Sequence, residues 1–272
     1  MRLRSLLLLA VPAVLAAQGA ALGDLLVAPT HLVLDTKHRV GELILSNRGT
    51  TGGTFRVSTL VYQMNEDGAL IPAPAAAEGA IDLASLLRFA PRQVTLGPGE
   101  SQILRVQYRR PADIPEGEYR VHLHFKALPP TEKDTGGPKA ADAKGVHFSL
   151  QPVLSLAVPV SIMEGSTSVQ SSLDTLSITS NEAGPRLRLR LHRTGNAAAY
   201  GDFHVKFLPK SGKSFEAGVL QGVAAYPNLA ARWVEIPLHA PKDGELAHGR
   251  LELSFTEPDG DQVLARAALD LP

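Results

Sequence analysis

The feature that most constrains this chain is a run of alternating side chains over residues 145–162. Such period-two alternation predicts a β-strand with one buried face. The run is about three times as long as a typical strand of ~5–6 residues, and it contains Pro152 and Pro159. The chain is therefore expected to use β-strands for its core. The apolar members of the series are Val146, Phe148, Leu150, Leu154, Leu156, Val158, Val160 and Ile162.

The sequence before this run also consists of short alternating segments separated by turn residues. Helical periodicity is confined to residues 75–87, where we expect no more than a short turn. About seven short strands at this spacing predict a β-sandwich of immunoglobulin type. The expected strands cover residues 32–34, 41–45, 53–62, 92–96, 101–108 and 118–128, and the turns between them include residues 47–49, 65–68, 97–99 and 114–117.

A second all-β unit is expected after the long run. Residues 129–145 are polar and lack periodicity, which predicts a loop before the run. We therefore expect an all-β chain of two immunoglobulin-like sandwiches, residues 24–162 and residues 163–272. The strands expected in the second unit cover residues 173–179, 185–192, 204–208, 232–238, 249–255 and 262–271.

The first 23 residues predict export. Arg2 and Arg4 precede an apolar stretch, and small residues follow it, which is typical of a cleaved secretory signal peptide. The 272 residues carry 27 basic and 27 acidic side chains, so bulk electrostatic binding to nucleic acid is not expected. The chain has no cysteine, which excludes disulfides, thiolate metal sites and cysteine nucleophiles.

No motif predicts catalysis or a cofactor. There is no G-x-S-x-G segment, and the glycines of residues 49–54 lack the Lys-Ser/Thr that ends a phosphate-binding loop. His122 and His124, with His147, have spacing compatible with a metal, but no Asp or Glu accompanies the pair. We expect no enzyme activity, no metal and no cofactor.

Several segments of the first unit resemble one family. Residues 28–35 (APTHLVLD) resemble its opening strand, followed by residues 42–47 (ELILSN). Residues 89–102 contain the P…L.PG..Q pattern, and residues 116–120 lead into a strand that ends in Leu128-Pro129-Pro130. With the signal peptide and the long alternating strand, the chain resembles a divergent member of the PapD-like periplasmic chaperones of pilus assembly. The resemblance implies an L-shaped molecule with a cleft between its two domains.

The resemblance also implies a use for the long strand. Chaperones of this family lend it to a pilus subunit that lacks its last strand, a form of β-augmentation called donor-strand complementation. Val146, Phe148 and Leu150 occupy the donor positions, and Leu154 continues the series. Burying each such side chain is worth ~1.5–3 kcal/mol. The alternative is that these residues fill the core of their own domain, which we favour for the end of the run nearer residue 162.

The cationic anchors of the family are not present at their usual positions. The family holds the carboxyl terminus of the subunit with an Arg on the first strand and a Lys on the long strand, which here correspond to His31 and Ser155. A substitute is offered by the basic side chains that alternate along residues 120–126 and should share one face. These candidate carboxylate anchors are Arg120, His122, His124 and Lys126. The alternative is that they form an ordinary solvated face.

The partners implied are pilin-like subunits and an outer-membrane usher, with contact to the membrane only through them. Residues 186–192 form a cationic strand face that could dock an acidic partner such as the usher, although a solvated face is the commoner explanation. An unoccupied donor strand is an exposed edge, so a self-capping homodimer is also expected. Two alternatives stay open: a structural or adhesive two-domain protein, and a carbohydrate-binding module or fragment of a secreted enzyme.

Overall fold

The computed structural model describes residues 25–77, 80–129, 155–182, 184–239, 246–258, 260 and 262–272. Its strands form two groups, each around its own buried apolar cluster. The first cluster runs from Val27 to Ile162 and the second from Leu187 to Leu271. We call the two groups the N-terminal and C-terminal domains. The expected signal peptide, residues 1–23, and the segment 145–154 of the long run lie outside the described residues.

The N-terminal domain is a sandwich of two sheets. The first two strands, β1 (Leu25–Ala28) and β2 (Leu32–Asp35), are consecutive in sequence but belong to opposite sheets. The first sheet has the order β1-β3-β9-β7 and the second the order β2-β11-β10-β4-β8. The other strands are β3 (Val40–Asn47), β4 (Gly53–Leu60), β7 (Leu87–Ala90), β8 (Gln93–Leu96), β9 (Ser101–Tyr108), β10 (Gly117–Leu128) and β11 (Ser155–Glu164).

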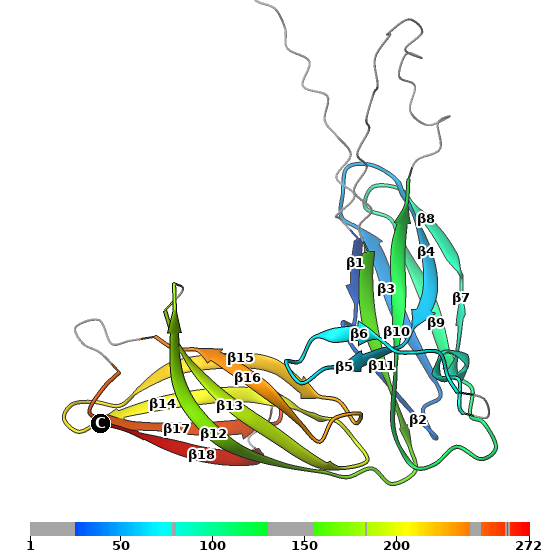
Figure 1. Cartoon of the computed structure of the whole chain (residues 1–272). Coiled ribbons are helices and arrows are strands. Elements are labelled where there is room, and N and C mark those ends of the chain that lie inside the picture. Colours follow the sequence, from blue (N-terminus) through cyan, green and yellow to red (C-terminus); the bar gives the residue numbers. More distant parts are fainter. Residues whose placement is uncertain are drawn as a thin grey trace, which may run out of the picture.

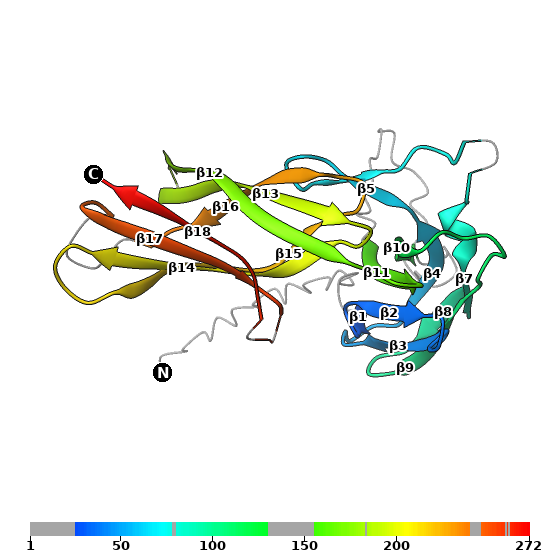
Figure 2. The ribbon, with the colours of Figure 1, turned by 90° about the horizontal axis from the view of Figure 1, so that it is seen from below.

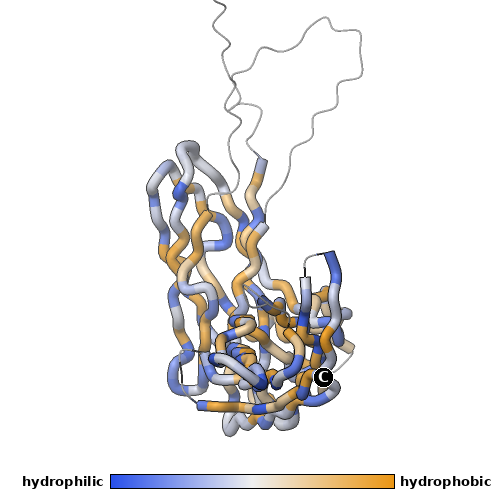
Figure 3. The backbone as a smooth tube through the Cα atoms, turned by 90° about the vertical axis from the view of Figure 1, so that its left-hand side faces the viewer, coloured by the Kyte–Doolittle hydropathy of each residue, from blue (hydrophilic) through white to orange (hydrophobic). Residues whose placement is uncertain are grey.

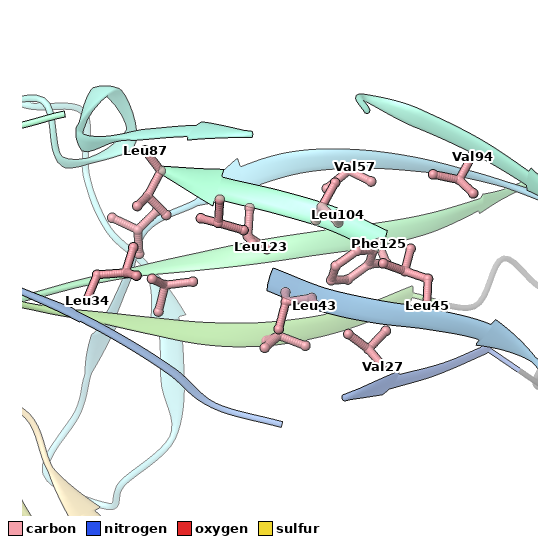
Figure 4. Packing of buried hydrophobic residues seen from close by; sticks show 14 of the residues in the cluster. Val27, Leu34, Leu43, Leu45, Val57, Leu87, Val94, Leu104, Leu123 and Phe125 are labelled. Carbon is pink, nitrogen blue, oxygen red and sulfur yellow. The ribbon is translucent and has the colours of Figure 1, made fainter. Parts of the chain in front are cut away.

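Alternation along these strands builds the core between the sheets. On β10, Val121, Leu123 and Phe125 are at most 1% exposed. Leu123 and Phe125 point toward the side of the facing sheet that carries Leu43 and Leu104 (Figure 4). Successive side chains of a strand point to opposite faces, so the residues between them lie on the outer face. Figure 3 shows the resulting alternation of apolar and polar positions along the backbone.

The C-terminal domain is a second sandwich, with sheet orders β12-β13-β16 and β15-β14-β17-β18. Its core includes the stacked rings of Phe203 and Phe255, whose centroids are 4.5 Å apart. The strands are β12 (Val169–Asn181), β13 (Gly184–Gly195), β14 (Ala199–Pro209), β15 (Phe215–Ala225), β16 (Ala231–Pro237), β17 (Gly249–Thr256) and β18 (Val263–Leu271).

The two-sandwich, all-β fold expected from the sequence is confirmed. The only helix among the described residues is the short 3-10 turn η1 (Leu83–Leu86), which begins after its N-cap Asp82. The expected strands are present among the described residues, but β1, the hairpin β5–β6, β7 and β15 were not foreseen. β15 contains Gly218 and Gly222 among small residues and therefore lacks a clear alternating pattern.

The two domains are joined as an L (Figure 1). A two-stranded hairpin, β5 (Tyr62–Met64) and β6 (Leu70–Pro72), leaves the N-terminal domain and reaches the C-terminal domain near β13 and β16 (Figure 2). The described residues contain no helix long and apolar enough to cross a membrane.

Candidate functional site

The strand β11 is paired unequally along its two edges. β10 pairs with it from Ser155 to Glu164, whereas β2 pairs with the opposite edge only from Val160 to Met163. In the described part of the chain, no strand pairs with that edge before Val160. Backbone N–H and C=O groups on such an edge are a template for another strand.

Pro159 lies inside β11, directly opposite His122 of β10. The proline does not end the strand, because β11 continues to Glu164. A proline has no N–H to donate, so strands tolerate it where one edge is unpaired. Here β2 joins the free edge immediately after it, at Val160.

The side chains of β11 change from buried to exposed along the same face. Val158, Val160 and Ile162 are at most 3% exposed, but Leu156, which belongs to the same alternating series, is 40% exposed. The core of the N-terminal domain therefore uses the second half of the strand. The expected donor residues Val146, Phe148, Leu150 and Leu154 lie outside the described residues, so their role stays a prediction.

The four basic residues of β10 share the outer face of the five-stranded sheet, but their surroundings differ. Arg120 and His122 lie at the domain junction, and their side chains are largely covered. His124 is half-buried and Lys126 is exposed. The last two are therefore the members accessible to a partner.

A buried carboxylate organises the junction. Glu118 accepts hydrogen bonds from Arg120 Nε (3.1 Å), from the hydroxyl of Ser161 (2.9 Å) and, through its second oxygen, from the backbone N–H of Ala198 in the C-terminal domain (2.7 Å). Its own N–H donates to Asn196 O. Burial alone would raise the pKa of Glu118, but Arg120 and these hydrogen-bond donors lower it below its ordinary value.

Arg120 is thus already bound to a carboxylate of its own chain. Its guanidinium also lies 4.2 Å from the ring centroid of Tyr226 in the C-terminal domain. With only 10% of its side chain exposed, Arg120 offers little to a carboxylate from outside. Its observed role is to join the two domains.

His122 is enclosed by aromatic residues of the same junction. Its ring lies edge-on to Tyr62, at 4.9 Å between centroids, and its Nε2 is 3.3 Å from the hydroxyl of Tyr226. Its Nδ1 is buried and has no hydrogen-bond partner among the described residues. Burial, together with the nearby Arg120, lowers the pKa of His122 to about 4. His122 is therefore neutral at pH 7.

The structure does not bring His31 and Ser155 together. His31 Nε2 lies 3.0 Å from the hydroxyl of Ser161, which is six residues further along β11 than Ser155. Six residues of strand span roughly 20 Å. The two family anchor positions assigned from the sequence therefore do not form one site here.

Lys126 lies directly opposite Ser155 on one side and Arg56 of β4 on the other. Like charges in opposite positions on neighbouring strands repel each other, and both Arg56 and Lys126 are exposed. Arg56 was not recognised as a candidate from the sequence, because only the register between β4 and β10 places it beside Lys126. Together with His124 they form what we call the outer basic patch.

No group of three potential metal ligands occurs among the described residues. His122 and His124 share a face, and the third histidine of the sequence motif, His147, lies outside the described residues.

The basic face expected over residues 186–192 lies on the strand β13, and its side chains have partners within the chain. Arg188 and Arg190 stack on Trp233, and Arg190 also pairs with Glu66.

Comparison with known proteins finds likenesses among solved structures only. No family model matches the chain, and no curated protein matches it. The class 5 fimbriae chaperone CfaA shares 12% identity at a TM-score of 0.45, over 92% of this chain and 100% of that one. The CupB2 chaperone of Pseudomonas aeruginosa shares 10% identity at a TM-score of 0.47, over 91% and 100% of the two chains.

A third similar structure is the complex of CsuC with the tip subunit CsuE from archaic chaperone-usher pili of Acinetobacter baumannii. It shares 13% identity at a TM-score of 0.43, over 91% of this chain and 99% of that one. Two of these three solved structures are chaperones and the third is a complex of a chaperone with a subunit. At these identities the likeness concerns the fold, so the function is inferred below from the residues of this chain.

Proposed function

We propose that the protein is a periplasmic chaperone that binds subunits of pili or related surface fibres by donating a strand, and delivers them to an outer-membrane usher. The observation that carries the proposal is the open edge of β11 between Ser155 and Pro159. A groove in an incomplete subunit needs a strand with free backbone groups and apolar side chains at every second position. The open edge supplies the first, and the series that ends at Leu156 supplies the second.

The donated segment is the alternating run before β11, with Val146, Phe148 and Leu150 as the residues that enter the groove. Leu154 and Leu156 continue the contact toward the core of the chaperone. When no subunit is present, a second copy of the chain covers the same edge as a self-capping homodimer.

The carboxyl terminus of the subunit is held by the outer basic patch. Lys126 of β10 supplies the positive charge. It lies directly opposite Ser155, the position at which the family has its Lys. Arg56 and His124 support it from neighbouring positions on the same face. Of the four basic residues considered as anchors from the sequence, Arg120 and His122 are left out of this proposal. Glu118 already neutralises Arg120, and His122 is neutral and buried.

Strand donation is tested by co-expression with the subunits encoded beside this gene, followed by co-purification. Phe148→Asp and Leu150→Asp place a charge in the groove, and losing ~1.5–3 kcal/mol for each side chain should weaken binding about 10- to 100-fold. Ser149→Asp, on the opposite face of the same segment, is the matched control. Equal recovery of the subunit with all three variants would show that the strand is not donated and would favour a structural or adhesive role.

The carboxylate site is tested with a peptide of the subunit carboxyl terminus and its amidated form. Lys126→Ala should lower the affinity of the free-acid peptide several-fold and leave the amidated peptide unchanged. Lys37→Ala, an exposed lysine away from the patch, is the control. If Lys126→Ala binds both peptides as the parent protein does, the anchor is elsewhere.

A further inference from the structure

The hairpin β5–β6 belongs to neither sandwich. Its strands have three residues each, and they pair only with one another. Asn65 closes the turn between them by accepting hydrogen bonds from the backbone N–H groups of Asp67 and Ala69. An isolated two-stranded hairpin is at best marginally stable in water. This hairpin therefore needs support from what it touches.

The hairpin is bound to the C-terminal domain through its backbone. Trp233 N–H of β16 donates to Glu66 O at 2.6 Å. The side-chain amide of Asn228 donates to Met64 O (2.9 Å) and accepts from Met64 N–H (3.2 Å), as the backbone of a neighbouring strand would. These three bonds attach the tip and one strand of the hairpin to the second domain.

Side chains reinforce the same contact. The carboxylate of Glu66 lies 3.0 Å from Arg190, which together with Arg188 stacks on the indole of Trp233. Gly68, at a φ of 83°, lies so close to the guanidinium of Arg232 that a Cβ there would overlap it. The surfaces of hairpin and domain therefore fit closely at this point.

The domains meet at a second place, beside the covalent linker. There Glu118 binds Asn196 and Ala198, and Arg120 packs on Tyr226. Contacts that lie only beside the linker still allow one domain to rotate relative to the other about that linker. Relative motion of domains is the usual behaviour when the interface is small. A second attachment on another element removes that rotation.

We propose that the β5–β6 hairpin is a brace that fixes the angle between the two domains. It is anchored in the N-terminal domain through β4 and in the C-terminal domain through β16. The brace also places Tyr62 against His122, so it covers the junction from the side of the hairpin. The consequence for subunit binding, a corner of constant width beside β11, rests on the proposed function, but the brace itself does not.

The brace is tested by measuring the distance between the domains. Because the chain has no cysteine, spin labels can be placed at Gln107→Cys in β9 and Ala268→Cys in β18, both exposed positions. Gly68→Ala should displace Arg232, and Asn228→Ala removes both bonds to Met64. In the spin-labelled double variant Gly68→Ala/Asn228→Ala, we expect the distribution of distances between the two spin labels to become at least about twofold broader than in the spin-labelled parent protein.

Matched controls separate the loss of the hairpin contact from the backbone strain that any side chain causes at a glycine with positive φ. Gly99 has a similar backbone, at a φ of 73°, but a Cβ there has no atom within 4 Å, so Gly99→Ala carries the strain without the overlap. Gln63→Ala changes an exposed side chain of β5. Both should keep the narrow distribution.

The fluorescence of Trp233, the single tryptophan of the chain, reports whether the hairpin has left β16. A shift to longer wavelength together with a broader distance distribution supports the brace. An unchanged distance distribution in the double variant overturns it, whether or not Trp233 shifts, because the linker-side contacts would then hold the angle alone. These measurements use the chaperone without a subunit, so their outcome is independent of strand donation.

Discussion

Glu118 combines three tasks that are usually divided among several residues. It neutralises Arg120, accepts the hydroxyl of Ser161 and accepts a backbone N–H from the other domain. Since Ser161 gives its one hydrogen to Glu118, His31 Nε2 must be the donor in the contact with Ser161. A single buried carboxylate thereby orders a chain of polar groups that runs from His31, just before β2, to the C-terminal domain.

We expect the neutral His122, at the same junction, to make the stability of the protein sensitive to acid. In the unfolded chain a histidine takes up a proton near pH 6.5, but in the folded protein the pKa of His122 is about 4. The unfolded state therefore binds more protons between these values, and the free energy of unfolding falls as the pH drops from about 6.5 to about 4. The loss from this residue amounts to about 3 kcal/mol and is absent above pH 7.

Urea unfolding at a series of pH values checks this prediction when the parent protein is compared with His122→Gln. The difference between the two should change with pH over that window, because the glutamine has no proton to gain. Arg120 and His31 face His122 and oppose its charge, while Tyr62 and Tyr226 cover it. A difference that stays constant from pH 7 to pH 4 would mean that His122 is accessible to water.

At the scale of the element, β11 is a strand with two kinds of surroundings. Its second half is central in the sheet, between β10 and β2, and its first half is an edge. Leu156 marks the change, since it belongs to the buried series yet is 40% exposed. Under the proposed function, we expect Leu156 to contact the bound subunit at the end of the donated segment.

Leu156→Asp should therefore weaken subunit binding about tenfold, the equivalent of ~1.5 kcal/mol of apolar burial. The effect on the stability of the protein without a subunit should be small, since much of the side chain is already in water. Binding can be measured by titrating a labelled subunit in the presence of each variant. Ile103→Asp, which changes an exposed apolar side chain of β9 in the other sheet, should bind as the parent does, and equal weakening by both variants would argue against side-chain insertion.

The division of β11 also shows what the sequence can predict. Alternation is a local property, and it correctly indicated the part of the long strand over residues 155–162 and the common face of the four basic residues. Register and pairing depend on contacts distant in sequence. For that reason Arg56 beside Lys126, and Ser161 rather than Ser155 beside His31, emerged only from the structure.

The hairpin β5–β6 was not predicted from the sequence, for a related reason. Residues 53–62 were expected as one strand followed by a turn at residues 65–68, which is close to β4 and the hairpin tip. A three-residue strand carries too little alternation to be recognised. Its attachment to β16 depends on Asn228 and Trp233, which lie more than 160 residues further along the chain.

At the scale of the whole molecule, two sandwiches without disulfides share one polar junction and one brace. Each domain has its own apolar core, so each holds most of what it needs to fold. What couples them is the buried set around Glu118 together with the hairpin contacts. The coupling decides whether the protein unfolds in one step or two.

Glu118→Gln should separate the unfolding of the two domains. The change keeps the shape of the side chain but leaves the buried guanidinium of Arg120 without its counter-charge, a loss of about 3–5 kcal/mol for a broken buried ion pair. Differential scanning calorimetry should show one transition for the parent protein and two for the variant, since the lost energy lies at the contact between domains. Glu42→Gln, which removes an exposed pair with Arg105 on the outer face of β3, is the control and should cost at most about 1 kcal/mol. One sharp transition in the Glu118→Gln variant, lowered in temperature but not divided, would place the coupling in the hairpin rather than at Glu118.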